Sequence, residues 1–227
     1  MRSVPALFLA ACPDPGRLRA PLGPIDLQTA IHRIHVVEDR EEMTLFLSSG
    51  AFPCELPSRL STGLEGPSAD ETLADLAVAG CREGSQHLTL HLSRPRAFEG
   101  WGGTYQAIAP DTTDTTDTTD TTDTTDTQAR DRTVQGTYYG IEEAFLVQLD
   151  GLIRGYAAYE DLVLTLGDGG TVQVDPDTDG IEGGLAFPTE GISGTFRSRR
   201  CPTDQASMLD LIEATPLELL CRTLSFQ

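Results

Sequence analysis

The sequence predicts an all-β fold, a sandwich or barrel of antiparallel strands with two short peripheral helices. Short runs rich in β-branched and aromatic residues recur along the chain, and Gly, Pro and Asp-Gly turn signals separate them. Only two segments have helical periodicity. The 227 residues, 39% of them hydrophobic, suffice for one β domain over 25–227, and two domains of about 90 residues each are the alternative.

The first 24 residues precede this β domain. Arg2 and an apolar stretch lead to Leu9-Ala10-Ala11-Cys12, which resembles the lipobox of bacterial lipoproteins. In that family the cysteine thiol receives a diacylglyceryl group, and the signal peptide is removed so that this cysteine becomes the first residue. The resemblance implies a signal peptide at 1–11, lipidation of Cys12, and a lipid-anchored place on the periplasmic or surface side of a bacterial cell envelope. Residues 12–24, which are rich in proline, would form a tether.

Two strands are expected before the middle of the chain, at 43–47 and 87–92. The second alternates cleanly between two faces. One face would carry Leu88, Leu90 and Leu92, and the other His87, Thr89 and His91.

An Asp-Thr repeat over 111–127 divides the chain. Its six aspartates, with only threonine between them, bury no apolar area, so the repeat cannot fold alone. The flanking runs 101–110 and 132–141 look like neighbouring strands. We therefore interpret the repeat as an overgrown loop within one domain; a cation-attracting or O-glycosylated spacer is the functional alternative.

The second half of the chain predicts hairpins. Asp150-Gly151 would turn the hairpin 144–159, and 167–170 would turn a second hairpin over 161–174. Further short strands are expected at 184–188 and 191–201.

Helical periodicity is confined to 68–80 and 203–216. The first segment begins with a capping box formed by Ser68 and Glu71, and Gly80 ends it. The second ends before Pro216, and its apolar face would comprise Met208, Leu211 and Ile212.

The five cysteines support export. If Cys12 is lipidated, an even set of four remains, and exported proteins usually pair their cysteines. We favour Cys54 with Cys81 and Cys201 with Cys221, because each pair lies on one side of the repeat. The alternative is a cytosolic protein with free buried thiols.

The acidic segment 174–184 is the sharpest candidate for chemistry. Asp175, Asp177 and Asp179, followed by Gly180, match the start of a calcium loop, although a glutamate is missing at the last position of an EF-hand and the flanks look like strands. Glu182 or Glu190 would supply an additional ligand. An ordinary acidic turn is the simpler interpretation.

The histidines do not predict a metal site. His87 and His91 would lie about 13 Å apart on one strand, and His32 and His35 would face opposite sides of another. We therefore expect histidines solvated on exposed faces.

The formal charge of -19 disfavours binding to nucleic acid. Motifs of nucleophilic enzymes are absent from the sequence. The first hypothesis is thus a non-enzymatic binding or structural module that is held at the membrane by its lipid and has an unknown protein or glycan partner. The alternative is an exported hydrolase with an unrecognised active site.

Overall fold

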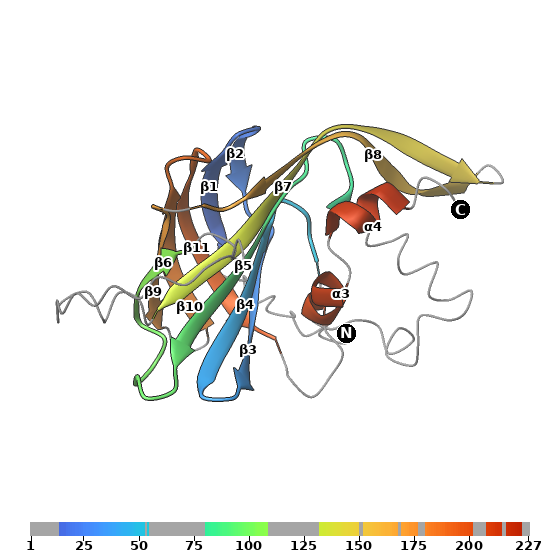
Figure 1. Ribbon diagram of the computed structural model, residues 1–227. Helices are drawn as coiled ribbons and strands as arrows, with labels where there is room; N and C mark the ends of the chain where they lie inside the picture. The colour runs from blue at the N-terminus through green and yellow to red at the C-terminus, as the bar shows by residue number, and fades with distance from the viewer. Residues whose placement is uncertain are drawn as a thin grey trace, which may run out of the picture.

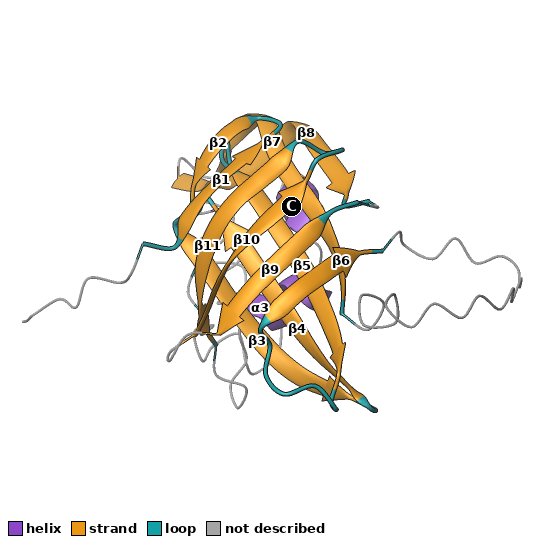
Figure 2. Cartoon of the chain, turned by 90° about the vertical axis from the view of Figure 1, so that its left-hand side faces the viewer, coloured by secondary structure: helices purple, strands orange, loops and turns teal. Residues whose placement is uncertain are grey.

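A computed structural model describes residues 14–52, 54, 80–108, 132–149, 152–167, 169–176, 180–201, 208–214 and 217–223. It confirms the all-β fold, since the strands form a single sheet that closes into a barrel (Figures 1 and 2). The described strands are β1 (Gly16–Ala20), β2 (Gly23–Asp26), β3 (Thr29–Val37), β4 (Arg40–Ser48), β5 (Gln86–Pro95), β6 (Gly103–Ala107), β7 (Thr133–Leu149), β8 (Leu152–Thr165), β9 (Thr171–Pro176), β10 (Gly180–Phe187) and β11 (Ile192–Arg200). The described helices are α3 (Met208–Ala214) and α4 (Leu217–Thr223).

The barrel wall runs in the order β3-β4-β5-β7-β6-β9-β10-β11 and returns to β3. Most neighbours are antiparallel, as expected, but two contacts are parallel: β6 with β7, and β11 with β3. Both contacts are short, and each leaves room on the same edge for another strand. Accordingly β1 also pairs with β11, and β8 pairs with β7. Strands from both sides of the Asp-Thr repeat therefore belong to one sheet.

The interior of the barrel is filled by one row of side chains from each strand. Because successive residues point to opposite faces, Leu88, Leu90 and Leu92 of β5 all point inward, as their alternation predicted. Met43, Leu45 and Leu47 on β4 stand beside them. The inward side chains of the other strands complete this core, among them Leu18, Ile25, Tyr105, Val134, Tyr138, Val172, Val174, Leu185, Phe187, Ile192 and Phe196.

A buried ion pair lies near one end of this core. Arg94 continues the inward row of β5, and its guanidinium contacts the Glu41 carboxylate at 2.5 Å. The same guanidinium lies 4.9 Å from the ring centroid of Trp101 and donates to the carbonyl of Phe98. The Glu41 carboxylate thus neutralises the charge of Arg94, as a buried cation requires. The indole ring of Trp101 covers one face of the guanidinium.

A second, smaller core lies outside the wall, where α3 and α4 cover the outer faces of β3, β4, β5 and β7 (Figure 1). The helices contribute Leu209, Ile212 and Leu217, and the barrel contributes Ile31, Phe46, Tyr139 and Ile141. The described part of the chain has no helix that is both long and apolar enough to cross a membrane.

Two disulfides lie in this outer layer. Cys81–Cys221 fastens α4 to the segment before β5, and Cys54–Cys201 joins the segment after β4 to the end of β11, so all four predicted cysteines are paired. The pairing that we favoured, Cys54 with Cys81 and Cys201 with Cys221, is wrong. The expectation assumed that each side of the repeat folds by itself, whereas the closed barrel brings the two halves of the chain together.

Three other expectations need correction. Residues 16–26 form β1 and β2 in place of the C-terminal part of a tether, and Leu18 and Ile25 point into the core. The turn at 167–170 does not make a hairpin, because β8 pairs with β7 and β9 with β6 and β10. His32 and His87 are buried, not solvated. The predicted helix 68–80 lies outside the described residues except for Gly80.

The remaining element predictions agree with the structure. The strands at 43–47 and 87–92 lie within β4 and β5, and the hairpin turning near 150–151 is formed by β7 and β8. The runs on either side of the Asp-Thr repeat are neighbours, as β6 and β7. The second predicted helix is α3, which ends before Pro216.

Candidate functional site

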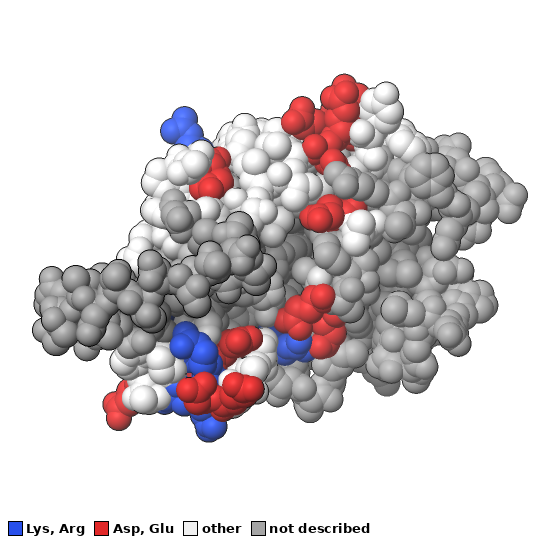
Figure 3. Space-filling model, viewed as in Figure 1, with Lys and Arg blue, Asp and Glu red and all other residues white. Residues whose placement is uncertain are grey.

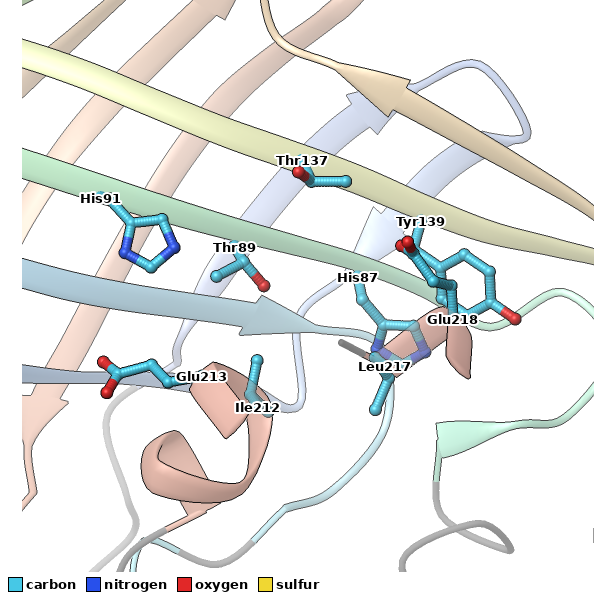
Figure 4. Close-up of a pocket in the computed structure, with 9 residues that line it drawn as sticks. All are labelled: His87, Thr89, His91, Thr137, Tyr139, Ile212, Glu213, Leu217 and Glu218. Atoms are coloured by element: carbon cyan, nitrogen blue, oxygen red, sulfur yellow. The ribbon is translucent and has the colours of Figure 1, made fainter. Parts of the chain in front are cut away.

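A pocket of about 350 Å³ opens on the side of the barrel, between its wall and the two helices (Figure 4). We call it the lateral pocket. The barrel side consists of outward residues of β5 and β7, and the helices form the facing side. Its lining residues are His87, Thr89, His91, Thr137, Tyr139, Ile212, Glu213, Leu217 and Glu218.

The strand register explains why the barrel side is polar. His87, Thr89 and His91 alternate with the inward leucines of β5, so all three point outward. In the antiparallel pairing with β7, His87 lies opposite Tyr139, and Thr89 lies opposite Thr137. Two neighbouring strands thereby present a continuous polar surface to the helices.

The position of α3 is fixed by polar contacts from β3 and β4. The Arg33 guanidinium binds both Asp210 and Glu213, at 2.8 Å from the Oε2 atom of Glu213. The Thr44 hydroxyl donates to the Oε1 atom of Glu213 at 2.6 Å. Both oxygens of the Glu213 carboxylate therefore have partners, and Glu213 shares the single positive charge of Arg33 with Asp210.

His87 forms the innermost part of the pocket lining. Its ring lies between Phe46 and Tyr139, with ring centroids 6.0 Å away on each side. The Nε2 atom lies 2.7 Å from the carbonyl oxygen of Gly80, which can only accept, so Nε2 carries the proton. The Nδ1 atom then accepts from the Ser48 hydroxyl at 2.8 Å. Burial lowers the pKa of His87 to about 4, although the bond to the Gly80 carbonyl acts in the opposite direction.

His91 lies at the other end of the same row, with one side open to solvent. The Thr44 hydroxyl already donates to Glu213, so at 3.4 Å its oxygen can only accept from the Nδ1 atom of His91. This arrangement leaves the Nε2 atom with a lone pair. The pocket walls desolvate the ring and lower the pKa of His91, whereas the carboxylates of Glu213 and Glu42 raise it.

Glu218, in the first turn of α4, brings a second carboxylate to the pocket. Figure 4 shows it at the end of the pocket away from His91. Figure 3 shows acidic side chains on the face that carries α3 and α4, and basic side chains near α3 and at the lower left of the same face. The lining of the lateral pocket contains two carboxylates and neither arginine nor lysine, so it is an acidic site.

Two serine–histidine contacts occur among the described residues, and neither serine lines the lateral pocket. Ser48, which contacts His87, is fully buried and accepts from the backbone NH of Gly50. Ser198 contacts His32 at 2.8 Å, and both residues are buried on inward rows of the barrel. Burial and the nearby charge of Arg200 lower the pKa of His32 to about 4. A substrate could reach neither hydroxyl, so these contacts stabilise the fold.

The residues predicted as ligands or anchors lie elsewhere. Asp175 is on the outer face of β9, directly opposite Glu182 of β10, whereas Asp177, Asp179 and Cys12 lie outside the described residues. Within the described ranges, no cluster of three or more His, Cys, Asp or Glu side chains could hold a metal ion. Asp175, the one predicted calcium ligand that the structure describes, is not part of the lining of the lateral pocket.

Sequence reasoning did not identify the lateral pocket. The polar row of β5 was recognised, but it was expected to face solvent. One signal could have indicated a cover: Cys201 and Cys221 enclose an amphipathic helix, and disulfide-bonded helices need a surface to pack on. The helix α4 gave a weaker signal, because it begins directly after Pro216 and is only 7 residues long.

The fold and the pocket define a class: a closed β-barrel with a filled interior and a side pocket beneath a disulfide-bonded helical cover. No protein-family model matches the chain, and neither a curated protein nor a solved structure matches it. The function must therefore be argued from the geometry of the site.

Proposed function

We propose that the protein is an exported binding module whose ligand site is the lateral pocket. The observation that carries this proposal is the pocket itself, which combines about 350 Å³ of volume with polar groups converging from β5, β7, α3 and α4. The barrel interior is occupied by large apolar side chains, so the space between barrel and helices is the better candidate for a small ligand.

The disulfides favour export over a cytosolic location. Paired structural cysteines persist in oxidising compartments and are rare in the cytosol. With four cysteines paired, Cys12 is the remaining one of five, which agrees with its expected role as the lipidated residue. We therefore propose a lipid-anchored protein of the bacterial cell envelope.

Binding to the lateral pocket is favoured over hydrolysis. Its lining contains neither serine nor cysteine, and the two histidines that contact serines do so in buried positions. An exported hydrolase is the alternative, and its nucleophile would have to lie outside the pocket lining.

Blocking the lateral pocket tests the binding function. Thr89 is at the centre of the barrel side, so Thr89→Trp should fill the pocket. Wild-type protein is incubated with a small-molecule extract of the bacterial envelope, and native mass spectrometry identifies retained compounds. We expect retention by the wild type and loss of retention in Thr89→Trp.

A matched control separates pocket filling from general damage. Thr195 is exposed on the outer face of β11, outside the pocket lining, so Thr195→Trp should retain the same compounds as the wild type. Equal retention by all three proteins, or no retained compound, would refute the lateral pocket as a ligand site.

The anchor is tested by intact mass of the protein from its native membrane fraction. A chain that begins at Cys12 and carries added acyl mass is expected, with mass four hydrogens lower because of the two disulfides. Cys12→Ser should release the protein from the membrane. Unmodified full-length protein in the cytosol would contradict the proposal.

Calcium binding at Asp175, Asp177 and Asp179 is a second, separate proposal. It is supported by the register, because Asp175 and Glu182 are directly opposed on β9 and β10, and like charges so placed repel. A calcium ion would relieve that repulsion. Chelation should then lower the melting temperature of the wild type but not that of Asp175→Asn, and equal melting curves would remove the site.

A further inference from the structure

Hydrogen-bond accounting of the lateral pocket indicates what kind of ligand it accepts. None of its nine lining side chains offers a free N–H donor. The Nε2 proton of His87 is used by the Gly80 carbonyl, and the Tyr139 hydroxyl donates to Asp161 at 3.2 Å. Among the other polar side chains, the carboxylates and the Nε2 atom of His91 accept, and the hydroxyls of Thr89 and Thr137 can accept or donate.

The charges of the lining agree with this accounting. Lowered pKa values keep His87 and His91 neutral at neutral pH, so the lining has no positive charge of its own. Glu213 forms an ion pair with Arg33, which also pairs with Asp210. Glu218 is half-buried in the lining, and its carboxylate forms neither an ion pair nor a hydrogen bond with another side chain that the structure describes.

Apolar side chains line the same pocket. They include Leu217 and Ile212 from the helices and the ring of Tyr139 from β7 (Figure 4). A pocket that combines a carboxylate with an aromatic ring is suited to an ammonium group, because both groups attract a cation. The two aliphatic side chains would contact the carbon chain that bears it.

We infer that the lateral pocket binds a small organic ammonium ion, an aliphatic amine whose N–H groups donate to Glu218. This inference rests on the proposed binding function and specifies its ligand class. The lone pair on Nε2 of His91 and the hydroxyls of Thr89 and Thr137 would accept from further donors on the ligand. The overall charge of -19 increases the local concentration of such a cation near the pocket.

Three probes of similar size test the ligand class: 1-aminopentane, 1-pentanol and pentanoate. Each is titrated into the disulfide-bonded protein at pH 7.5, and binding is followed by NMR shifts of the pocket residues. The amine should bind about tenfold more tightly than the alcohol, because a charge-assisted hydrogen bond to a carboxylate is stronger than a neutral one. Pentanoate should not bind.

Glu218→Gln should remove this preference. We expect about a tenfold loss of affinity for 1-aminopentane with unchanged affinity for 1-pentanol. Glu218→Asp keeps the charge and should keep the preference for the amine. The matched control is Glu99→Gln, since Glu99 is exposed in the loop between β5 and β6 and outside the pocket lining.

The outcomes separate this inference from the proposal on which it rests. Equal affinities for amine and alcohol, equal effects of Glu218→Gln and Glu99→Gln, or no binding of any probe would overturn the amine inference. The binding function itself would still stand if the wild type, but not Thr89→Trp, retains a compound of the envelope extract. If Thr89→Trp makes no difference in that experiment, both fall.

Discussion

At the scale of single residues, buried histidines are the most consequential polar groups of the structure. His87 is held between aromatic rings, and both ring nitrogens have protein partners. An imidazolium would carry a second N–H toward Ser48, whose oxygen already accepts from the Gly50 amide, and would have to be desolvated. The neutral form is therefore part of the folded state.

The stability of the protein should fall when the pH drops from about 6.5 to 4. The folded-state pKa values of His32 and His87 are about 4, below the value of about 6.5 expected in the unfolded chain. Between these values the unfolded chain binds more protons, so acid favours unfolding. Each histidine should lower the free energy of unfolding by about 3 kcal/mol across this window. Denaturant titrations at pH 7 and pH 4.5 measure the effect.

Variants assign that pH dependence to its source. His87→Gln should reduce the difference between the two pH values by about half. His35→Gln is the matched control, because His35 is half-exposed and pairs with Glu42 on the surface. The assignment would be wrong if His87→Gln and the wild type showed the same difference.

The alternation of β5 shows what the sequence can and cannot predict at this scale. Period two correctly separated Leu88, Leu90 and Leu92 from His87, Thr89 and His91. The alternation could not show that a second layer packs on the polar row. It distinguishes the apolar face of a strand from the polar face, but it carries no information about what covers the polar face. The candidate site was missed for this reason.

At the scale of elements, the helical cover depends on long-range links. The two disulfides bridge 147 and 140 residues, and Arg33 and Thr44 add polar contacts from β3 and β4 to α3. The connectivity of disulfides that span such separations cannot be read from cysteine spacing, because four cysteines allow three connectivities.

The strands β1 and β2 were missed for a related reason, since short segments with proline and glycine form strands here only because β11 provides a partner.

Loss of one disulfide should cost somewhat less than its sequence separation suggests. With Cys81–Cys221 intact, the segments 54–81 and 201–221 are already held together, so Cys54–Cys201 closes an additional loop of about 47 residues. Because the entropy depends on the logarithm of loop length, this lowers the expected cost by roughly 1 kcal/mol. We expect Cys54→Ala with Cys201→Ala to lower the free energy of unfolding by about 2 to 4 kcal/mol. Removing both disulfides should destabilise the protein by more than either single loss. Denaturant titration provides the comparison.

Peptide mapping under non-reducing conditions is the control for this experiment. Wild-type digests should contain peptides that join residue 54 to 201 and residue 81 to 221. A peptide that joins Cys54 to Cys81 would contradict both the connectivity and the expected energies.

At the scale of the whole molecule, closure of the barrel depends on its two parallel contacts. One lies between β3 and β11 and the other between β6 and β7. The sequence predicted the fold class and the adjacency of β6 and β7, because local alternation and turn residues suffice for both. It did not predict the barrel order, since the parallel contact of β3 with β11 joins segments from opposite ends of the domain.

The Asp-Thr repeat lies within the connection between β6 and β7, and their register predicts how dispensable it is. Ala107, the last residue of β6, pairs with Val134 near the start of β7, so the connection returns almost to the point where it leaves the sheet. A short loop can span that distance. Deleting four Asp-Thr-Thr units roughly halves the connection and should lower the closure cost by about 0.6 kcal/mol. It also removes four of the negative charges that repel one another.

The deletion should therefore leave the barrel folded, with a melting temperature equal to or slightly above that of the wild type. A variant in which the same four aspartates are replaced by serine keeps the length and separates the effect of charge from that of loop closure. If deletion lowers the melting temperature by more than about 3 °C, or about 1 kcal/mol for a domain of this size, the repeat contributes contacts of its own. The interpretation as a tolerated loop would then be wrong, and the cation-attracting or glycosylated spacer would gain support, since either role requires the aspartates or threonines that the variants remove.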